Sequence, residues 1–105
     1  MNRDLLKTAV TRGRLEWQRH ALERMMERDI SREVVTEVLI SGEIVEDYPD
    51  DQPYPSVLIL GWNRKKPIHV VAAFDPESEW CIVITAYRPD LEHFEPDYRT
   101  RRDKK

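Results

Sequence analysis

The apolar residues of this chain recur with a helical period in its first part. In residues 17–30, WQRHALERMMERDI, a rotation of about 100° per residue gathers five apolar side chains on one arc: Trp17, Ala21, Leu22, Met25 and Met26. Charged residues occupy the opposite side. The pattern predicts an amphipathic helix from about residue 18 to residue 28.

Two further helices are expected on either side of this one. Apolar residues at helical spacing predict a helix over residues 2–12, which Gly13 would end. Another set predicts a helix that begins after the N-cap Ser31 and is closed by Gly42 at C′. Because few residues separate the last two helices, they should form a corner or a hairpin.

After Gly42 the apolar period changes to two, which is typical of strands. The pattern predicts strands over residues 44–48, 57–62, 68–74 and 80–87, joined by short turns and one loop with two prolines. Short connections make neighbouring strands antiparallel. Residues 15–17 alternate too briefly for more than an extended lead-in. The fold class is therefore α+β, with N-terminal helices packed on one face of a four-stranded antiparallel sheet. We expect one domain over residues 1–99 and a mobile basic tail over residues 100–105.

Strict alternation assigns side chains to the two faces of the predicted sheet. His69 shares a face with Val71 and Ala73, and in the last strand Thr85 and Tyr87 share a face with Cys81 and Val83. Polar groups that can transfer protons thus lie among apolar neighbours on adjacent strands.

Composition restricts the function classes. The chain has 105 residues, 35% of them charged, and a formal net charge of −3, which argues against a general polyanion binder. Residues 43–53 are acidic and residues 98–105 basic, so affinity for RNA would have to be local. The single Cys81 excludes an internal disulfide and multi-cysteine zinc sites. The absence of a signal peptide or a membrane-length apolar run predicts a cytoplasmic protein that does not contact membranes.

The histidines and arginines suggest phosphodiester chemistry. His20, Arg24 and Arg28 stand one turn apart along the border of the amphipathic helix. Metal-independent RNA cleavage needs a base, an acid and a cation. His20 and His69 would be acid and base in unassigned order, Arg24 would stabilise the phosphate and Tyr87 would orient it, if these side chains meet over one patch of the sheet.

Each of these residues also has a purely structural interpretation. His20 can be a solvated surface residue, His69 a satisfied core histidine, and Thr85 a strand former. Arg24 and Arg28 can pair with nearby glutamates on the helix surface. The three histidines lack the spacing of a metal-binding helix, and the three glycines form no phosphate-binding loop, so no metal and no small-molecule cofactor is expected.

Four blocks of the sequence resemble a known family. HALERMMERDIS, SGEIVEDYP, PIHVV and ITAYRPD, in this order between His20 and Asp90, are similar to the domain-of-unknown-function family 4258. That family resembles RelE-like toxins and the barnase, EndoU and colicin ribonucleases. The resemblance implies a toxin that cleaves RNA and a cognate antitoxin as partner. It singles out His20, Arg24, His69, Thr85 and Tyr87.

The resulting hypothesis is a metal-independent endoribonuclease of a toxin–antitoxin pair. Its substrate-binding residues would be Arg28, Thr85, Arg88, Arg64 and Lys65. One alternative is a catalytically inactive module that binds a partner protein through the helix border and the acidic loop. Another is RNA binding without cleavage, through the basic tail and the turn at residues 63–66.

Overall fold

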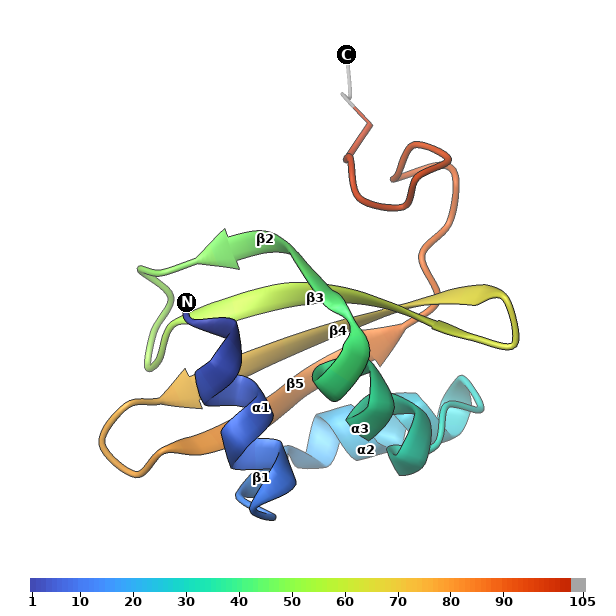
Figure 1. Ribbon diagram of the computed structural model, residues 1–105. Helices are drawn as coiled ribbons and strands as arrows, with labels where there is room; N and C mark the ends of the chain where they lie inside the picture. Colours follow the sequence, from blue (N-terminus) through green and yellow to red (C-terminus); the bar gives the residue numbers. More distant parts are fainter. Residues whose placement is uncertain (103–105) are drawn as a thin grey trace.

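Three helices and a five-stranded mixed sheet make up the part of the chain that the computed structural model describes, residues 1–102 (Figure 1). The elements in chain order are α1 (Arg3–Thr11), β1 (Leu15–Trp17), α2 (Arg19–Glu27), α3 (Arg32–Ser41), β2 (Glu43–Tyr48), β3 (Ser56–Asn63), β4 (Lys66–Asp75) and β5 (Trp80–Tyr87). The predicted α+β class is confirmed, and every predicted helix is present.

The sheet has one more strand than the sequence pattern predicts. Strands β2 to β5 form the expected antiparallel meander, and the spatial order is β1-β5-β4-β3-β2. The short β1 pairs in parallel with β5, with Leu15 opposite Cys81. The extended lead-in is therefore part of the sheet. Three alternating residues were too short a pattern to indicate this pairing.

The helices cover one face of the sheet, and the core lies between them (Figure 1). Ser31 caps α3 as predicted, since its hydroxyl accepts a hydrogen bond from the Val34 amide. Gly13 ends α1 with a left-handed φ of 75°. Gly42 has an ordinary φ of −74°, so it is not the left-handed cap that we expected. Its lack of a side chain serves close packing instead, because a Cβ there would lie 2.6 Å from the Val38 carbonyl oxygen.

A bulge in β5 corrects the predicted assignment of faces. Val71 pairs with Thr85, and the next residue, Ala72, pairs with Val83, so Ile84 is the extra, unpaired residue of the bulge. Thr85 and Tyr87 therefore do not share the face of Cys81 and Val83. Tyr87 pairs directly with His69, on the face turned away from the helices.

That second face is partly covered by the chain that follows β5. We call residues 89–102 the covering segment; it lies on the side of the sheet opposite the helices (Figure 1). The predicted tail begins inside it, where the Thr100 carbonyl oxygen accepts a hydrogen bond from the Glu95 amide and Arg101 donates to Glu46. Residues 103–105 lie outside the described residues. Within residues 1–102, no helix is long and apolar enough to cross a membrane.

Candidate functional site

His69 is the centre of a polar cluster on the face away from the helices. It is fully buried, although it is a polar residue on a central strand. Its Nε2 lies 2.7 Å from the carbonyl oxygen of Tyr98, and its Nδ1 lies 3.2 Å from the hydroxyl of Tyr87. Because a carbonyl oxygen can only accept, Nε2 carries the proton, and Nδ1 accepts from Tyr87.

Aromatic rings enclose the imidazole. The ring of Phe94 packs edge-on against it at a centroid distance of 4.6 Å, and Tyr87 does so at 5.3 Å. Burial in these surroundings lowers the pKa of His69, while the nearby Glu46 carboxylate acts in the opposite direction. Burial likewise raises the pKa of Tyr87, so its hydroxyl stays protonated and can donate.

A carboxylate and a guanidinium complete the cluster. The Tyr48 hydroxyl donates to Glu46, and Nε of Arg101 lies 2.8 Å from Glu46 Oε2. Burial acts to raise the pKa of Glu46, but these hydrogen bonds outweigh it and hold the pKa below its usual range. Glu46 is therefore ionised at neutral pH. We call His69, Tyr87, Glu46, Tyr48 and Arg101 the His69 cluster.

The structure does not bring His20 to His69, which corrects the expected convergence. His20 lies on α2, whose buried residues Ala21 and Met25 face the helix side of the sheet. Its side chain is 87% exposed and lies 3.9 Å from a Glu23 carboxylate oxygen. Arg24 pairs with Glu27 on the same exposed surface. The layers of the fold separate these two residues from the His69 cluster.

Arg28, Thr85 and Arg88 form a structural junction at the end of β5. The guanidinium of Arg28 donates to the carbonyl oxygen of Ala86 at 2.9 Å and approaches the Thr85 hydroxyl at 3.4 Å. The guanidinium of Arg88 donates to the carbonyl oxygens of Arg28 and Asp29. Both arginines thus tie the corner between α2 and α3 to the sheet.

Arg64 and Lys65 form the turn between β3 and β4, both with left-handed φ values, of 51° and 65°. Arg64 also lines a cleft of about 680 Å³ together with Lys66 and Arg88. The floor of this cleft includes Met25 and Ile68, so it opens on the helix side of the sheet. Trp62, 55% exposed, precedes the same turn, and its ring lies 6.1 Å from that of Tyr98.

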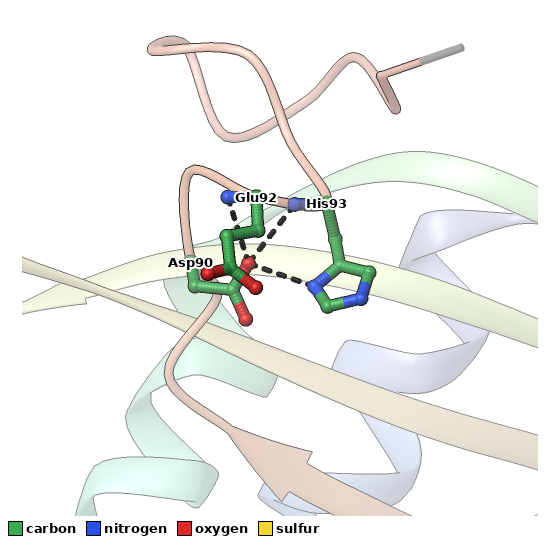
Figure 2. A group of neighbouring side chains, drawn as sticks. All are labelled: Asp90, Glu92 and His93. Atoms are coloured by element: carbon green, nitrogen blue, oxygen red, sulfur yellow. Dashed lines mark hydrogen bonds and ion pairs between the residues drawn. The ribbon is translucent and has the colours of Figure 1, made fainter. Parts of the chain in front are cut away.

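Asp90, Glu92 and His93 bring three potential metal ligands within 4.8 Å of one another (Figure 2). One oxygen of Asp90 accepts hydrogen bonds from the amides of Glu92 and His93 and lies 2.8 Å from Nδ1 of His93. The group is exposed and is accounted for as the cap of a turn.

Three members of the cluster were not predicted from the sequence: Glu46, Tyr48 and Arg101. Residues 43–53 were recognised as acidic and residues 98–105 as basic, but the two stretches were not expected to meet. In the structure Glu46 pairs with Arg101 and Glu43 pairs with Arg99. The complementary charge of the two stretches was the available signal, and pairing them would have placed the covering segment beside β2.

The comparisons with known proteins give a family and no individual relative. A family described as "Domain of unknown function (DUF4258)" matches residues 17–88. No curated protein and no solved structure matches the chain. The matched residues contain α2, α3 and strands β2 to β5, and therefore include every member of the His69 cluster except Arg101.

Proposed function

The chain belongs to the family Domain of unknown function (DUF4258), and within it we propose that this protein is an endoribonuclease that needs no metal ion. The observation that carries the proposal is the His69 cluster. A carboxylate, an imidazole, a guanidinium and two phenols meet on one face of the sheet, although they come from three strands and the covering segment.

The cluster supplies the three groups that the reaction needs. Glu46 is ionised and takes the proton of the ribose 2′-hydroxyl, whose oxygen then bonds to phosphorus. The bond from phosphorus to the 5′ oxygen breaks, and His69, once its Nδ1 has also taken up a proton, gives that oxygen the proton of Nε2 and returns to the neutral imidazole. The guanidinium of Arg101 leaves the Glu46 carboxylate, binds the phosphate and stabilises the negative charge that the phosphate gains in the transition state. The products are a 2′,3′-cyclic phosphate and a 5′-hydroxyl.

Tyr87 is a positioning residue in this proposal. Its hydroxyl bonds Nδ1 of His69 and thereby directs Nε2 toward the position that the Tyr98 carbonyl oxygen now occupies. The Glu46 carboxylate favours the charged imidazole, so a hydrated ring can take up a proton from water at Nδ1; the Tyr87 hydroxyl then accepts from Nδ1, and the imidazolium is the acid.

RNA would reach the cluster along the same face of the sheet. The exposed indole of Trp62 offers a surface on which a base can stack, and Arg64 and Lys65 at the adjacent turn offer charges for phosphates. We assign Arg28, Thr85 and Arg88 to the junction at the end of β5, and His20 and Arg24 to the outer surface of α2.

The finer classification is part of the same proposal. A RelE-like fold and a role as the toxin of a toxin–antitoxin pair are supported by the helices on one face of an antiparallel meander and by the resemblance of the four sequence blocks. The cognate antitoxin would be the protein partner.

RNA binding without cleavage is the second candidate, and the basic cleft favours it. Arg64, Lys66 and Arg88 surround an apolar floor on the helix side of the sheet. Such a protein would retard RNA in a gel in a salt-dependent way and leave it intact.

The test is cleavage of a labelled RNA in EDTA. Glu46→Gln keeps the shape of the side chain and removes the base, so we expect the rate to fall by a factor on the order of 10². His20→Ala is the matched control and should cleave at the wild-type rate. Equal rates for Glu46→Gln and wild type would overturn the assignment of Glu46, and intact RNA with every variant from pH 5 to pH 9 would overturn the activity.

A further inference from the structure

The covering segment blocks the residue that the proposed reaction most needs. The main-chain carbonyl oxygen of Tyr98 accepts the hydrogen bond of His69 Nε2, and the ring of Phe94 packs edge-on against the imidazole. His69 has no exposed surface as a result, although it lies on the sheet face that no helix covers. No phosphodiester can touch Nε2 while this contact persists.

The attachment of the segment is nevertheless slight. It contains no helix and no strand, and of its residues only Pro89 and Phe94 are buried. Its other long-range anchors are the edge-on contact of the Tyr98 ring with the exposed Trp62 and two ion pairs, Arg99 with Glu43 at the surface and Arg101 with the partly buried Glu46. Exposed ion pairs contribute little, and a region with few buried apolar contacts opens at a small cost in free energy.

The segment also holds its own shape. Asp90 caps its first turn and Asp97 its second, where the Asp97 carboxylate accepts from Thr100. Two main-chain bonds, from Glu95 to Thr100 and from Arg102 to His93, close the loop on itself. Such a unit can move as a body without losing its internal hydrogen bonds.

We propose that residues 89–102 form a releasable cover that keeps His69 inaccessible until it lifts from the sheet, and that Arg101, which belongs to the cover, moves with it while bound to the RNA phosphate. The inference rests on the proposed function, because RNA is the substrate that the cover would exclude. Residues 88–90 are the hinge, since they join the end of β5 to the first capped turn. RNA phosphates can replace the carboxylates that now bind Arg99 and Arg101, so the substrate itself favours release.

The test measures the accessibility of His69 in the folded protein. Diethyl pyrocarbonate modifies solvent-accessible imidazoles, and mass spectrometry locates the product at each histidine. The exposed His20 provides the reference rate within the same molecule. Arg99→Glu places like charges at the ion pair with Glu43 and leaves every member of the His69 cluster intact. We expect it to raise the labelling of His69 relative to His20 about fivefold.

Two matched variants separate release from general damage. Arg99→Lys keeps the charge, and the double exchange Arg99→Glu with Glu43→Arg restores an ion pair of opposite sense. Both should label His69 at the wild-type ratio, and the urea midpoint of unfolding should be the same for all four proteins. Wild-type labelling of His69 in Arg99→Glu, or labelling that rises only with loss of the folded state, would overturn the proposal.

An RNA assay on the same proteins distinguishes the two proposals. If Arg99→Glu raises both the labelling and the rate of cleavage, the cover and the activity are both supported. If labelling rises while RNA stays intact, the segment covers His69 but the proposed function fails. If all proteins cleave RNA alike with unchanged labelling, the activity stands and the cover is contradicted.

Discussion

At the scale of single residues, His69 has a structural role in the folded protein as well as the catalytic role that we propose. Its hydrogen bonds to Tyr87 and Tyr98 satisfy both ring nitrogens, as expected of a buried core histidine. The same bonds fix the proton on Nε2 and set the ring beside an ionised glutamate. His69 therefore stabilises the covered state, and in our proposal it acts as the acid once the cover has moved.

The lowered pKa of His69 predicts how stability depends on pH. Burial keeps the imidazole neutral in the folded protein, while in the unfolded chain the imidazole has its ordinary pKa of 6.5. The unfolded state therefore binds more protons just below pH 6.5, and the free energy of unfolding should rise as the pH increases toward that value. Urea titrations at a series of pH values between 5 and 7 measure this slope.

Two variants test whether His69 causes this pH dependence of the free energy of unfolding. In His69→Gln the slope should be reduced, and in His20→Ala it should remain. The slope from Glu46 belongs to more acidic conditions, because hydrogen bonds from Tyr48 and Arg101 hold its folded pKa below the usual range; the stability it contributes is present above the unfolded pKa and is lost as the pH falls through the folded pKa. A slope that persists in His69→Gln would show that another group binds the proton.

The residues of the candidate site were only partly predictable. His69 and Tyr87 could be placed on adjacent strands from alternation alone, because their strands are long and regular. Their face could not, since one extra residue in β5, Ile84, exchanges the two faces and leaves no mark on the apolar pattern. Glu46 and Arg101 form an ion pair although they are 55 residues apart in the sequence, and local periodicity carries no information about such long-range contacts.

At the scale of elements, close contact between α3 and β3 fixes the helices on the sheet. A Cβ at Gly61 would lie 2.6 Å from a methyl carbon of Val38, and one at Gly42 would meet main-chain oxygens as closely. The glycines are needed here for space. This explains why Gly42 closes α3 without the left-handed conformation that the sequence suggested.

The contact predicts that Gly61→Ala is destabilising. Overpacking at a site with little freedom costs about 1 to 3 kcal/mol. Val38→Ala removes the methyl groups that the new Cβ would meet, so the double variant should be less destabilised than the sum of the two single ones. Urea unfolding of the four proteins measures the coupling. Strict additivity would contradict the packing described here.

Helices and strands were predicted well where their patterns were long. All three helices and the four meander strands lie where periodicity and capping residues placed them, within a few residues at the ends. The parallel pairing of β1 was missed because three residues show no reliable period, and because its partner β5 is distant in sequence.

At the scale of the whole molecule, charge is distributed so that a protein with net charge −3 can still present a local basic surface. The acidic β2 is neutralised by the covering segment through two ion pairs. Arg64 and Lys65 stand apart at the turn between β3 and β4, on the end of the sheet where Trp62 is exposed.

This distribution predicts how RNA affinity depends on salt. Replacing both Arg64 and Lys65 with Gln removes two phosphate contacts, so the slope of log affinity against log salt should decrease in magnitude by about 1.4. Replacing Lys7 and Arg12, on and just after α1, with Gln changes the net charge equally and serves as the control. Filter binding at several salt concentrations measures both slopes. Equal slopes in the two double variants would exclude the turn as a binding site.

The most direct test of the central claim is the chemistry of the cut. Purified protein, as wild type and as Arg99→Glu, is incubated in EDTA with an RNA and with the same strand carrying 2′-deoxyribose at the cleavage position. The His69 cluster predicts cleavage of the RNA to a 2′,3′-cyclic phosphate and a 5′-hydroxyl, and no cleavage at the deoxyribose. Both strands intact with both proteins, or a cut at the deoxyribose, would contradict it.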